Sequence, residues 1–189
     1  FTETYQATRS PEYEDTARKV FTYVLRDLVS PEGAFYTAED ADSEGVEGKF
    51  YVWTADEIEQ ILGSRDAKAI CRAYGIQTGG NYTDEAAGAR SGANILHVPH
   101  DSKDSMSDLQ KLDEAREKLF KAREKRVHPI KDDKILADWN GLMIASLAMA
   151  ARAFEEPLYA RAAERAAGFI LKRLRDRNGT LLHRYRDGE

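Results

Sequence analysis

Residues 132–151 read Asp-Asp-Lys-Ile-Leu-Ala-Asp-Trp-Asn-Gly-Leu-Met-Ile-Ala-Ser-Leu-Ala-Met-Ala-Ala, and this stretch decides the fold. From Trp139 to Ala151 there is no charged side chain, and apolar residues occupy every side of the expected helix. A helix that is apolar all round is buried on every side. This one is too short to cross a membrane, which takes roughly 20 apolar residues. The sequence therefore predicts a central, buried helix.

The entrance of this helix is polar. Charged, aromatic and amide side chains gather there: Asp132, Asp133, Lys134, Asp138, Trp139 and Asn140. Asp138 can cap the helix, because a carboxylate at an N-terminus satisfies free N–H groups and interacts favourably with the helix dipole. The same groups can also line a pocket at the mouth of the helix. The two interpretations are compatible, and the sequence leaves both open.

Composition excludes several classes of partner. The chain has 189 residues and a formal net charge of −5, so it lacks the basic character that binding to nucleic acid or to an anionic membrane requires. Cys71 is the only cysteine, which excludes an intrachain disulfide and favours a reducing, cytoplasmic compartment. We interpret Cys71 as a small core residue. The glycines match no nucleotide-binding loop, and we expect no metal or cofactor.

The first half of the chain predicts a helix followed by extended structure. Ser10 and Pro11 are a good N-cap and first helical residue, and apolar spacing continues the helix to Val29. Residues 34–53 hold two extended, aromatic segments on either side of an acidic run. This pattern predicts a β-hairpin with a long acidic tip.

Two capping boxes mark the helices that follow. Thr54 and Glu57 form the first, directly after the expected hairpin. Ser107 and Gln110 form the second, at the start of a densely charged helix that reaches about Arg126. A long connection with little periodicity separates the two.

The last helix, expected from Pro157 to about Leu174, repeats the first. Identical residues recur 146 positions apart: Pro11 with Pro157, Tyr13 with Tyr159, Ala17 with Ala163, Leu25 with Leu171, Leu28 with Leu174, and Gly33 with Gly179. Such self-similarity is typical of stacked helical hairpins, although unrelated amphipathic helices also share some apolar spacing. The repeat predicts a slice of a larger ring of paired helices, beginning just after one buried helix and ending just before another.

Two blocks of residues are specific enough to indicate a family. The first block is Gly-Ala-Phe-Tyr-Thr-Ala-Glu-Asp-Ala-Asp-Ser at 33–43, followed by Glu-Gly-Lys-Phe-Tyr-Val-Trp at 47–53. The second is Asp-Asp-Lys-Ile-Leu-Ala-Asp-Trp-Asn-Gly-Leu at 132–142. Both resemble signatures of the YyaL family, which includes spermatogenesis-associated thioredoxin-like proteins. The resemblance covers nearly the whole chain.

The resemblance implies a fold. In this family a thioredoxin-like domain precedes an (α/α) toroid of the six-hairpin glycosidase type, and the chain resembles part of the toroid only. The expected fold is therefore mostly α: a partial (α/α) toroid of helical hairpins with a β-hairpin insertion, forming one domain fragment over residues 1–189. Its expected parts are a helix of one hairpin (1–33), the β-hairpin (34–53), helices and a long connection (54–131), and the buried helix with its outer helix (132–189). The thioredoxin-like domain of the same full-length protein becomes an expected partner.

Acidic residues in both blocks suggest catalysis on sugars. Glycoside hydrolysis needs two carboxylates that face the substrate, and the candidates are Asp40, Asp42 and Asp138. In a regular strand Asp40 and Asp42 point to the same side, and close like charges favour the protonated form of one carboxyl, as a general acid requires. The alternative is that these acids bind lysines or backbone amides and only shape the rim.

The remaining candidates are substrate-binding side chains: Tyr36, Glu39, Lys49, Tyr51, Trp53, Arg126, Asp132, Asp133, Lys134, Trp139 and Asn140. The aromatic rings can serve as platforms for sugar faces, and the cationic groups can hold carboxylate or phosphate. We expect the two motif blocks to converge, so that Asp40, Asp42, Asp138 and Trp139 share one cleft.

Two other kinds of site fit less well. The acidic tip matches four positions of a calcium-binding loop, but Tyr51 stands where a bidentate glutamate is needed. Sugar isomerases on toroids of this kind use histidines as proton carriers. All four histidines fall outside the predicted buried helices: His97, His100, His128 and His183.

Two hypotheses of function follow. The first is a carbohydrate-related module with a glycosidase-like or sugar-isomerase-like pocket that works in the full-length protein on a sugar or another small molecule. The second is a non-catalytic binding or scaffold module that works with the thioredoxin-like domain. The sequence does not decide whether the protein is an enzyme. A ring that is cut open leaves apolar helix faces uncovered, so self-association of the isolated chain is also expected.

Overall fold

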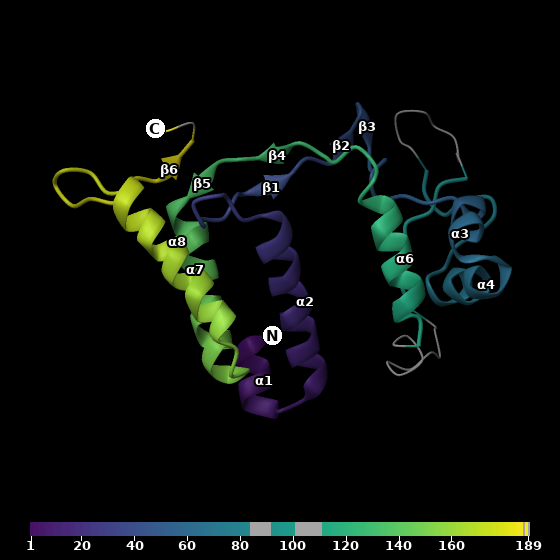
Figure 1. Cartoon of the computed structure of the whole chain (residues 1–189), viewed down its shortest axis with the longest axis horizontal. Helices are drawn as coiled ribbons and strands as arrows, with labels where there is room; N and C mark the ends of the chain where they lie inside the picture. The colour runs from purple at the N-terminus through teal and green to yellow at the C-terminus, as the bar shows by residue number, and fades with distance from the viewer. Residues whose placement is uncertain (84–91, 101–110, 187, 189) are drawn as a thin grey trace. The chain divides into compact units, whose positions relative to one another are not determined.

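A computed structural model describes residues 1–83, 92–100, 111–186 and 188 of the chain (Figure 1). The described residues form mostly helices, with three small two-stranded antiparallel sheets. This confirms the expected mostly-α fold with a β-hairpin insertion. Among the described helices, none is both long enough and apolar enough to cross a membrane.

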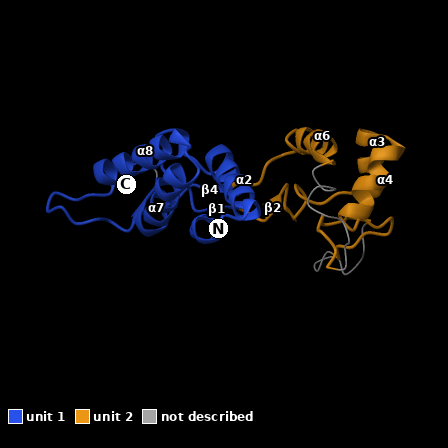
Figure 2. Cartoon of the chain, turned by 90° about the horizontal axis from the view of Figure 1, so that it is seen from below, with its two compact units in different colours: residues 1–39, 131–189 blue, residues 40–130 orange. Residues whose placement is uncertain are grey.

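The chain divides into two compact units, which Figure 2 colours separately. Unit 1 comprises residues 1–39 and 131–189, and unit 2 comprises residues 40–130. Unit 2 is thus an insertion in the sequence of unit 1. That both form one toroid domain stays a prediction.

Unit 1 has four described helices, and all but the first begin close to where the sequence predicts. They are α1 (Thr2–Thr8), α2 (Pro11–Asp27), α7 (Ala137–Ala153) and α8 (Pro157–Arg173). Proline takes the first position of both α2 and α8, where its fixed φ suits a helix and its missing N–H is not needed.

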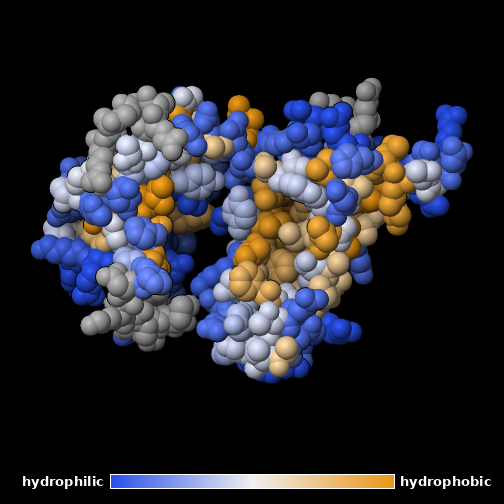
Figure 3. Space-filling model, turned by 180° about the vertical axis from the view of Figure 1, so that it is seen from behind, coloured by the Kyte–Doolittle hydropathy of each residue, from blue (hydrophilic) through white to orange (hydrophobic). Residues whose placement is uncertain are grey.

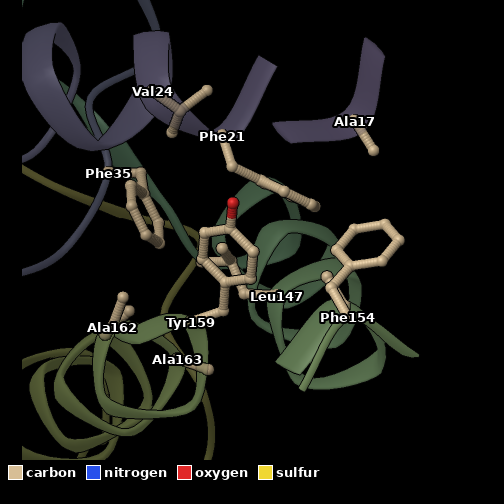
Figure 4. Close-up of a cluster of buried hydrophobic side chains, with 11 residues drawn as sticks. Ala17, Phe21, Val24, Phe35, Leu147, Phe154, Tyr159, Ala162 and Ala163 are labelled. Atoms are coloured by element: carbon tan, nitrogen blue, oxygen red, sulfur yellow. The ribbon is translucent and has the colours of Figure 1, made fainter. Parts of the chain in front are cut away.

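The main core of unit 1 lies between α2, α7 and α8 (Figure 4). The ring of Tyr159 lies 5.0 Å from that of Phe21 and 6.5 Å from that of Phe154, measured between ring centroids. Leu147 and Ala166 are fully buried beside them. Burial of each large apolar side chain contributes about 1.5–3 kcal/mol, so this cluster fixes how the three helices pack.

Short strands cover one end of unit 1, where α2 and α8 end and α7 begins (Figure 1). β1 (Ala38–Glu39) pairs with β4 (Lys131–Asp132), and β5 (Ile135–Leu136) pairs with β6 (Arg184–Tyr185). A second apolar cluster lies here and consists of Ala34, Ile135, Phe169, Ile170 and Leu174. We call this region the strand end of unit 1.

The 146-residue repeat is present in the backbone as well as in the sequence. α2 and α8 have the same length and begin and end at equivalent positions, and β6 is equivalent to β1. Gly33 and Gly179 both have positive φ, 98° and 87°, which a glycine adopts without strain. The turns repeat the same backbone hydrogen bonds: Gly33 N–H to Ser30 O and Gly179 N–H to Asp176 O, then Tyr36 N–H to Leu28 O and Leu182 N–H to Leu174 O. The match therefore extends well beyond shared apolar spacing.

One expectation about α7 is wrong. Asn140, Leu147 and Ala150 are buried, but the side of the helix that carries Trp139 and Leu142 is not, and these residues are 54% and 71% exposed. The physical reason is that α2 and α8 cover only part of the circumference of α7. Figure 3 shows apolar residues gathered on the surface of unit 1. The helix composition predicts burial on every side, but the described residues bury only one side of α7.

The helices of unit 2 are α3 (Ala55–Leu62), α4 (Ser64–Ala73) and α6 (Asp113–Arg123). The capping box of Thr54 and Glu57 is confirmed, with both of its reciprocal hydrogen bonds present. The second expected box, Ser107 with Gln110, lies outside the described residues. The charged helix expected to reach Arg126 is described from Asp113 to Arg123.

The β-hairpin is present but shorter than predicted over residues 34–53. Only β2 (Asp42–Ser43) and β3 (Val46–Glu47) pair with each other. Phe35 forms a bridge with Val29, and Trp53 forms one with Asn94, so the flanking aromatic segments pair elsewhere. The two segments look like hairpin strands in sequence because both are extended, but they do not pair with each other: Phe35 pairs with nearby Val29, and Trp53 pairs with distant Asn94.

Candidate functional site

Residues 33–39 of the first motif block meet the second block at the strand end of unit 1, and Asn140 joins them. Its side chain is 1% exposed. The side-chain oxygen accepts the N–H of Phe35 at 2.8 Å, and the amide nitrogen donates to the carbonyls of Phe35 at 3.0 Å and Leu136 at 2.9 Å. These bonds hold the start of α7 against the turn that follows α2. Asn140 is therefore placed as a structural link and not as a group facing a ligand.

A pocket of about 200 Å³ opens beside this link. Three aromatic residues, Tyr36, Phe169 and Tyr185, contribute to its lining, and the rings of Phe169 and Tyr185 meet edge to face at 5.1 Å. Its charged lining residues include Asp133 and Arg186. An apolar wall with a few fixed polar groups is the usual composition of a small-molecule site.

Ion pairs hold the charged groups of the pocket in place. Arg186 Nε lies 2.8 Å from Asp133 Oδ1, and Arg173 lies 3.1 Å from Glu32. The Glu32 carboxylate, chiefly through its hydrogen bond, raises the pKa of Arg173 above its usual value. Both pairs are partly open to solvent. A ligand can therefore replace water as the partner of those donors and acceptors that the ion pairs leave free.

Asp132 and Lys134 form a separate ion pair on the same segment, with 2.9 Å between Nζ and Oδ2. The hydrogen bond from Lys134 is the main reason that the pKa of Asp132 is lowered from 3.8. The backbone of Asp132 is also fixed, because its carbonyl accepts the hydroxyl of Thr37 at 3.0 Å.

Glu39, the first candidate on β1, is nearly enclosed. Its side chain is 9% exposed. The hydroxyl of Tyr23 donates to it at 3.0 Å, and Lys131 lies 3.7 Å away. Because Lys131 also donates to the carbonyl of Asp27, this network ties α2 to the β1–β4 pair.

Asp138 and Trp139 lie in the first turn of α7, and both are exposed. Leu136 occupies the N-cap position, so Asp138 does not cap the helix in the usual position. Its carboxylate instead accepts the N–H of Trp139 at 2.9 Å. The expected side-chain cap is therefore not formed. A carboxylate in the first turn still interacts favourably with the helix dipole, and its exposure leaves the pocket interpretation open.

The remaining acidic candidates belong to unit 2. Asp40 Oδ1 accepts the N–H of Asp42 at 3.2 Å, and the chain bends at Ala41 between them. The regular strand that would aim both carboxylates to one side is therefore not formed. Lys49 pairs with Glu44 at 2.8 Å. The expected cleft shared by Asp40, Asp42, Asp138 and Trp139 would join the two units and stays a prediction.

Arg126 and Trp53 make structural contacts inside unit 2. Arg126 donates to the carbonyls of Phe50 and Val52, each at 2.8 Å, and its guanidinium carbon lies 4.0 Å from the ring centroid of Trp53. Trp53 is 5% exposed, so the ring face under Arg126 is covered. Tyr51 is 39% exposed and packs edge to face with Phe50.

Sequence reasoning missed four residues that line the pocket, namely Glu32, Phe169, Tyr185 and Arg186, and Arg173, which pairs with Glu32. Each lies outside the two motif blocks. The repeat carried a usable signal, because Tyr185 is equivalent to Glu39 at the 146-residue spacing. β1 pairs with β4 in the segment before α7, and its equivalent β6 pairs with β5 in the same segment. The second pairing brings Tyr185 and Arg186 to Asp133.

Within the described ranges, no group of three or more His, Cys, Asp or Glu side chains could hold a metal ion. His128 packs its ring 4.6 Å from that of Phe50 and lies 3.7 Å from Glu124. His97 Nδ1 lies 3.2 Å from the carbonyl oxygen of Ile95, which accepts a hydrogen bond when that nitrogen carries the proton.

These features define a mostly helical module with repeated helix–turn–strand units and one inserted subdomain. No protein-family model matches the chain. It is 30% identical to spermatogenesis-associated protein 20 of Homo sapiens over 201 aligned residues, which cover 93% of this chain and 26% of the human protein. The protein of the same name from Rattus norvegicus is 32% identical over 79% of the chain, and an uncharacterised Caenorhabditis elegans protein is 34% identical over 86%.

The comparisons confirm the resemblance seen in the motif blocks. The chain is homologous to a segment of spermatogenesis-associated protein 20. It spans about a quarter of the length of these relatives.

Proposed function

We propose that unit 1 forms a carbohydrate-binding pocket at its strand end, which works as part of a longer protein. The observation that carries this proposal is the pocket of about 200 Å³ with Tyr36, Phe169 and Tyr185 beside the Asp133–Arg186 ion pair. Aromatic faces suit the apolar side of a sugar ring, and an ion pair offers donors and acceptors for its hydroxyl groups.

The volume limits the ligand. Sites for drug-sized molecules measure roughly 300–1,000 Å³, so a pocket of about 200 Å³ suits a single sugar ring. The exposed Trp139 and Asp138 would lie on further parts of the substrate or take part in catalysis. On this proposal Asp138 is the acid–base group of a glycosidase-like or isomerase-like reaction, and other parts of the protein provide its counterpart.

Saturation-transfer NMR with neutral mono- and disaccharides tests the binding. We expect transfer from the aromatic protons of the protein to the ring protons of at least one sugar. Arg186→Gln should abolish the signal, because it breaks the pair with Asp133. Arg26→Gln, which breaks a surface pair with Asp27 on α2, is the matched control and should leave the signal unchanged.

Catalysis is tested separately in the longer protein. Asp138→Asn should remove turnover of a sugar that the protein binds. Glu12→Gln removes a carboxylate from the first turn of α2, so it controls for the loss of a favourable helix-dipole interaction. Equal activity in both variants would exclude Asp138 from the reaction.

A second function is favoured by the uncovered side of α7. Trp139 and Leu142 present apolar surface there, as a scaffold module would for the thioredoxin-like domain implied by the family resemblance. Calorimetric titration of the chain with that domain tests this alternative. Binding that is lost in Leu142→Ser, together with no sugar binding, would replace the carbohydrate proposal. A cytoplasmic location, expected from the single cysteine, stays a prediction.

A further inference from the structure

Unit 2 contains a pocket of its own, and Trp53 is the one residue of its lining that was a candidate from the sequence. It measures about 170 Å³ and lies against α4, α6 and the segment near Leu96. Aromatic and aliphatic side chains such as Trp53, Tyr74 and Leu119 line it, and two arginines, Arg116 and Arg123, complete the lining. An apolar pocket bordered by two guanidinium groups has the composition of a site for an apolar anion.

Arg123 is held among aromatic rings. Its guanidinium carbon lies 5.3 Å from the ring centroids of both Phe50 and Tyr51 and 5.5 Å from that of Phe120. The side chain is 25% exposed. Rings in this arrangement attract a cation and keep water away from its faces. The guanidinium is therefore fixed in place and only partly hydrated before any ligand arrives.

The hydrogen bonding of Arg123 is incomplete. Its Nε atom is buried and donates to no partner within the described part of the chain. Its ion pair with Glu124 is long, at 3.9 Å. A buried donor without an acceptor is unfavourable, and a carboxylate oxygen is the acceptor that a guanidinium binds most strongly.

The charge around the pocket also favours an anion. Burial is the main cause of the lowered pKa of Arg126; the charge of Glu57 opposes this lowering, and the positive charge of Arg123 adds to it. The two guanidinium groups thus interact unfavourably with each other. Arg116 already pairs with Asp113 at 2.8 Å, on a side of α6 that is open to solvent. A ligand carboxylate beside Arg123 would offset the repulsion within the cluster.

We propose that this pocket binds a small carboxylate with an aromatic or branched apolar body. The body packs against Trp53, Tyr74 and Leu119, and the carboxylate binds Arg123. The volume is below that of drug-sized sites, so the ligand is of the size of phenylacetate. This site is separate in the sequence from the carbohydrate pocket of unit 1 and does not depend on it.

A pair of probes that differ only in charge tests the proposal on the whole chain. Phenylacetate and its neutral amide, phenylacetamide, have the same shape and the same ring. Saturation-transfer NMR and the fluorescence of Trp53, in a Trp139→Phe background, report binding. We expect phenylacetate to bind at least about tenfold more tightly, because only the carboxylate forms a charge-assisted hydrogen bond with Arg123.

Variants then assign the effect to one residue. Arg123→Gln should weaken phenylacetate to the level of the amide. Arg65→Gln, a control in the same unit whose side chain is 94% exposed and pairs with Asp66, should leave binding unchanged. If Arg123→Gln fails to fold by circular dichroism, the comparison of the two probes on the unaltered chain still decides. Equal binding of both probes, or no binding of either up to about 10 mM, would overturn the proposal.

Discussion

Replacing Asn140 by leucine tests whether one buried amide holds the start of α7 against the turn that follows α2. Leucine branches at the same atom as asparagine and is somewhat larger, so the substitution removes the hydrogen bonds without leaving a cavity. Three bonds are lost: one from Phe35 N–H and one each to the carbonyls of Phe35 and Leu136. A net contribution of about 1 kcal/mol per bond gives about 3 kcal/mol of lost stability. The loss rises further because the N–H and C=O of Phe35 are left buried without partners.

Urea unfolding followed by far-ultraviolet circular dichroism measures this loss. For a chain of this size, about 3 kcal/mol corresponds to a fall in Tm of roughly 6–12 °C. The amide of Phe35 should also exchange with solvent about 100-fold faster, because opening of the turn costs less free energy.

Ser146→Ala is the matched control on the same helix. Ser146 donates its hydroxyl to the carbonyl of Leu142, within α7 and near its surface, so its loss should change stability by less than about 0.5 kcal/mol. If Asn140→Leu is as stable as this control, the amide does not hold the strand end and the reasoning is refuted.

Three further predictions follow from other parts of the chain. Lowering of the pKa of Asp132 by Lys134 means that this carboxylate stabilises the fold above pH 3.8 and that its contribution is lost as the pH falls through the lowered value; in an NMR titration Lys134→Gln should return the pKa toward 3.8, whereas Lys19→Gln should not move it. Burial, and then the charge of Glu59, raises the pKa of the Cys71 thiol, so a disulfide reagent at pH 8 should label it more slowly than glutathione, and equal rates would contradict the burial. The uncovered apolar residues Trp139 and Leu142 should make the isolated chain self-associate, and light scattering should show less association for Leu142→Ser than for the unaltered chain; a monomer at all concentrations would contradict this.

The local features of the fold were predictable because they depend on short stretches of sequence. The proline starts of α2 and α8 and the capping box of Thr54 and Glu57 follow from backbone groups that a helix end leaves free. The repeat was also visible, because equivalent turns need glycine at the same position, as Gly33 and Gly179 show.

Long-range pairing was not predictable in the same way. The extended segment at 34–53 was expected to fold back on itself, but β1 pairs with β4 across the whole of unit 2. Hydrophobic patterning shows that a segment is extended and not which partner it takes. The burial of Trp53 beneath Arg126 was not predicted for the same reason, because the two residues are far apart in the sequence.

The motif blocks predicted only some of the residues that line the pocket. Tyr36 and Asp133 were identified because they lie in the motif blocks. Tyr185 and Arg186 lie in neither block, and only the pairing of β5 with β6 brings them to Asp133. Asn140 was identified as a ligand-binding group, but its side chain is used up by the backbone of Phe35 and Leu136.

Chemical-shift mapping of the aromatic rings during a sugar titration tests the carbohydrate proposal most directly. We predict that the ring signals of Tyr36 and Tyr185, which line the pocket, move with a single binding curve. The signals of Tyr5 and Tyr13, which do not line it, should stay in place. Sugar binding that leaves Tyr36 and Tyr185 unmoved, or the absence of binding to any sugar, would contradict the account.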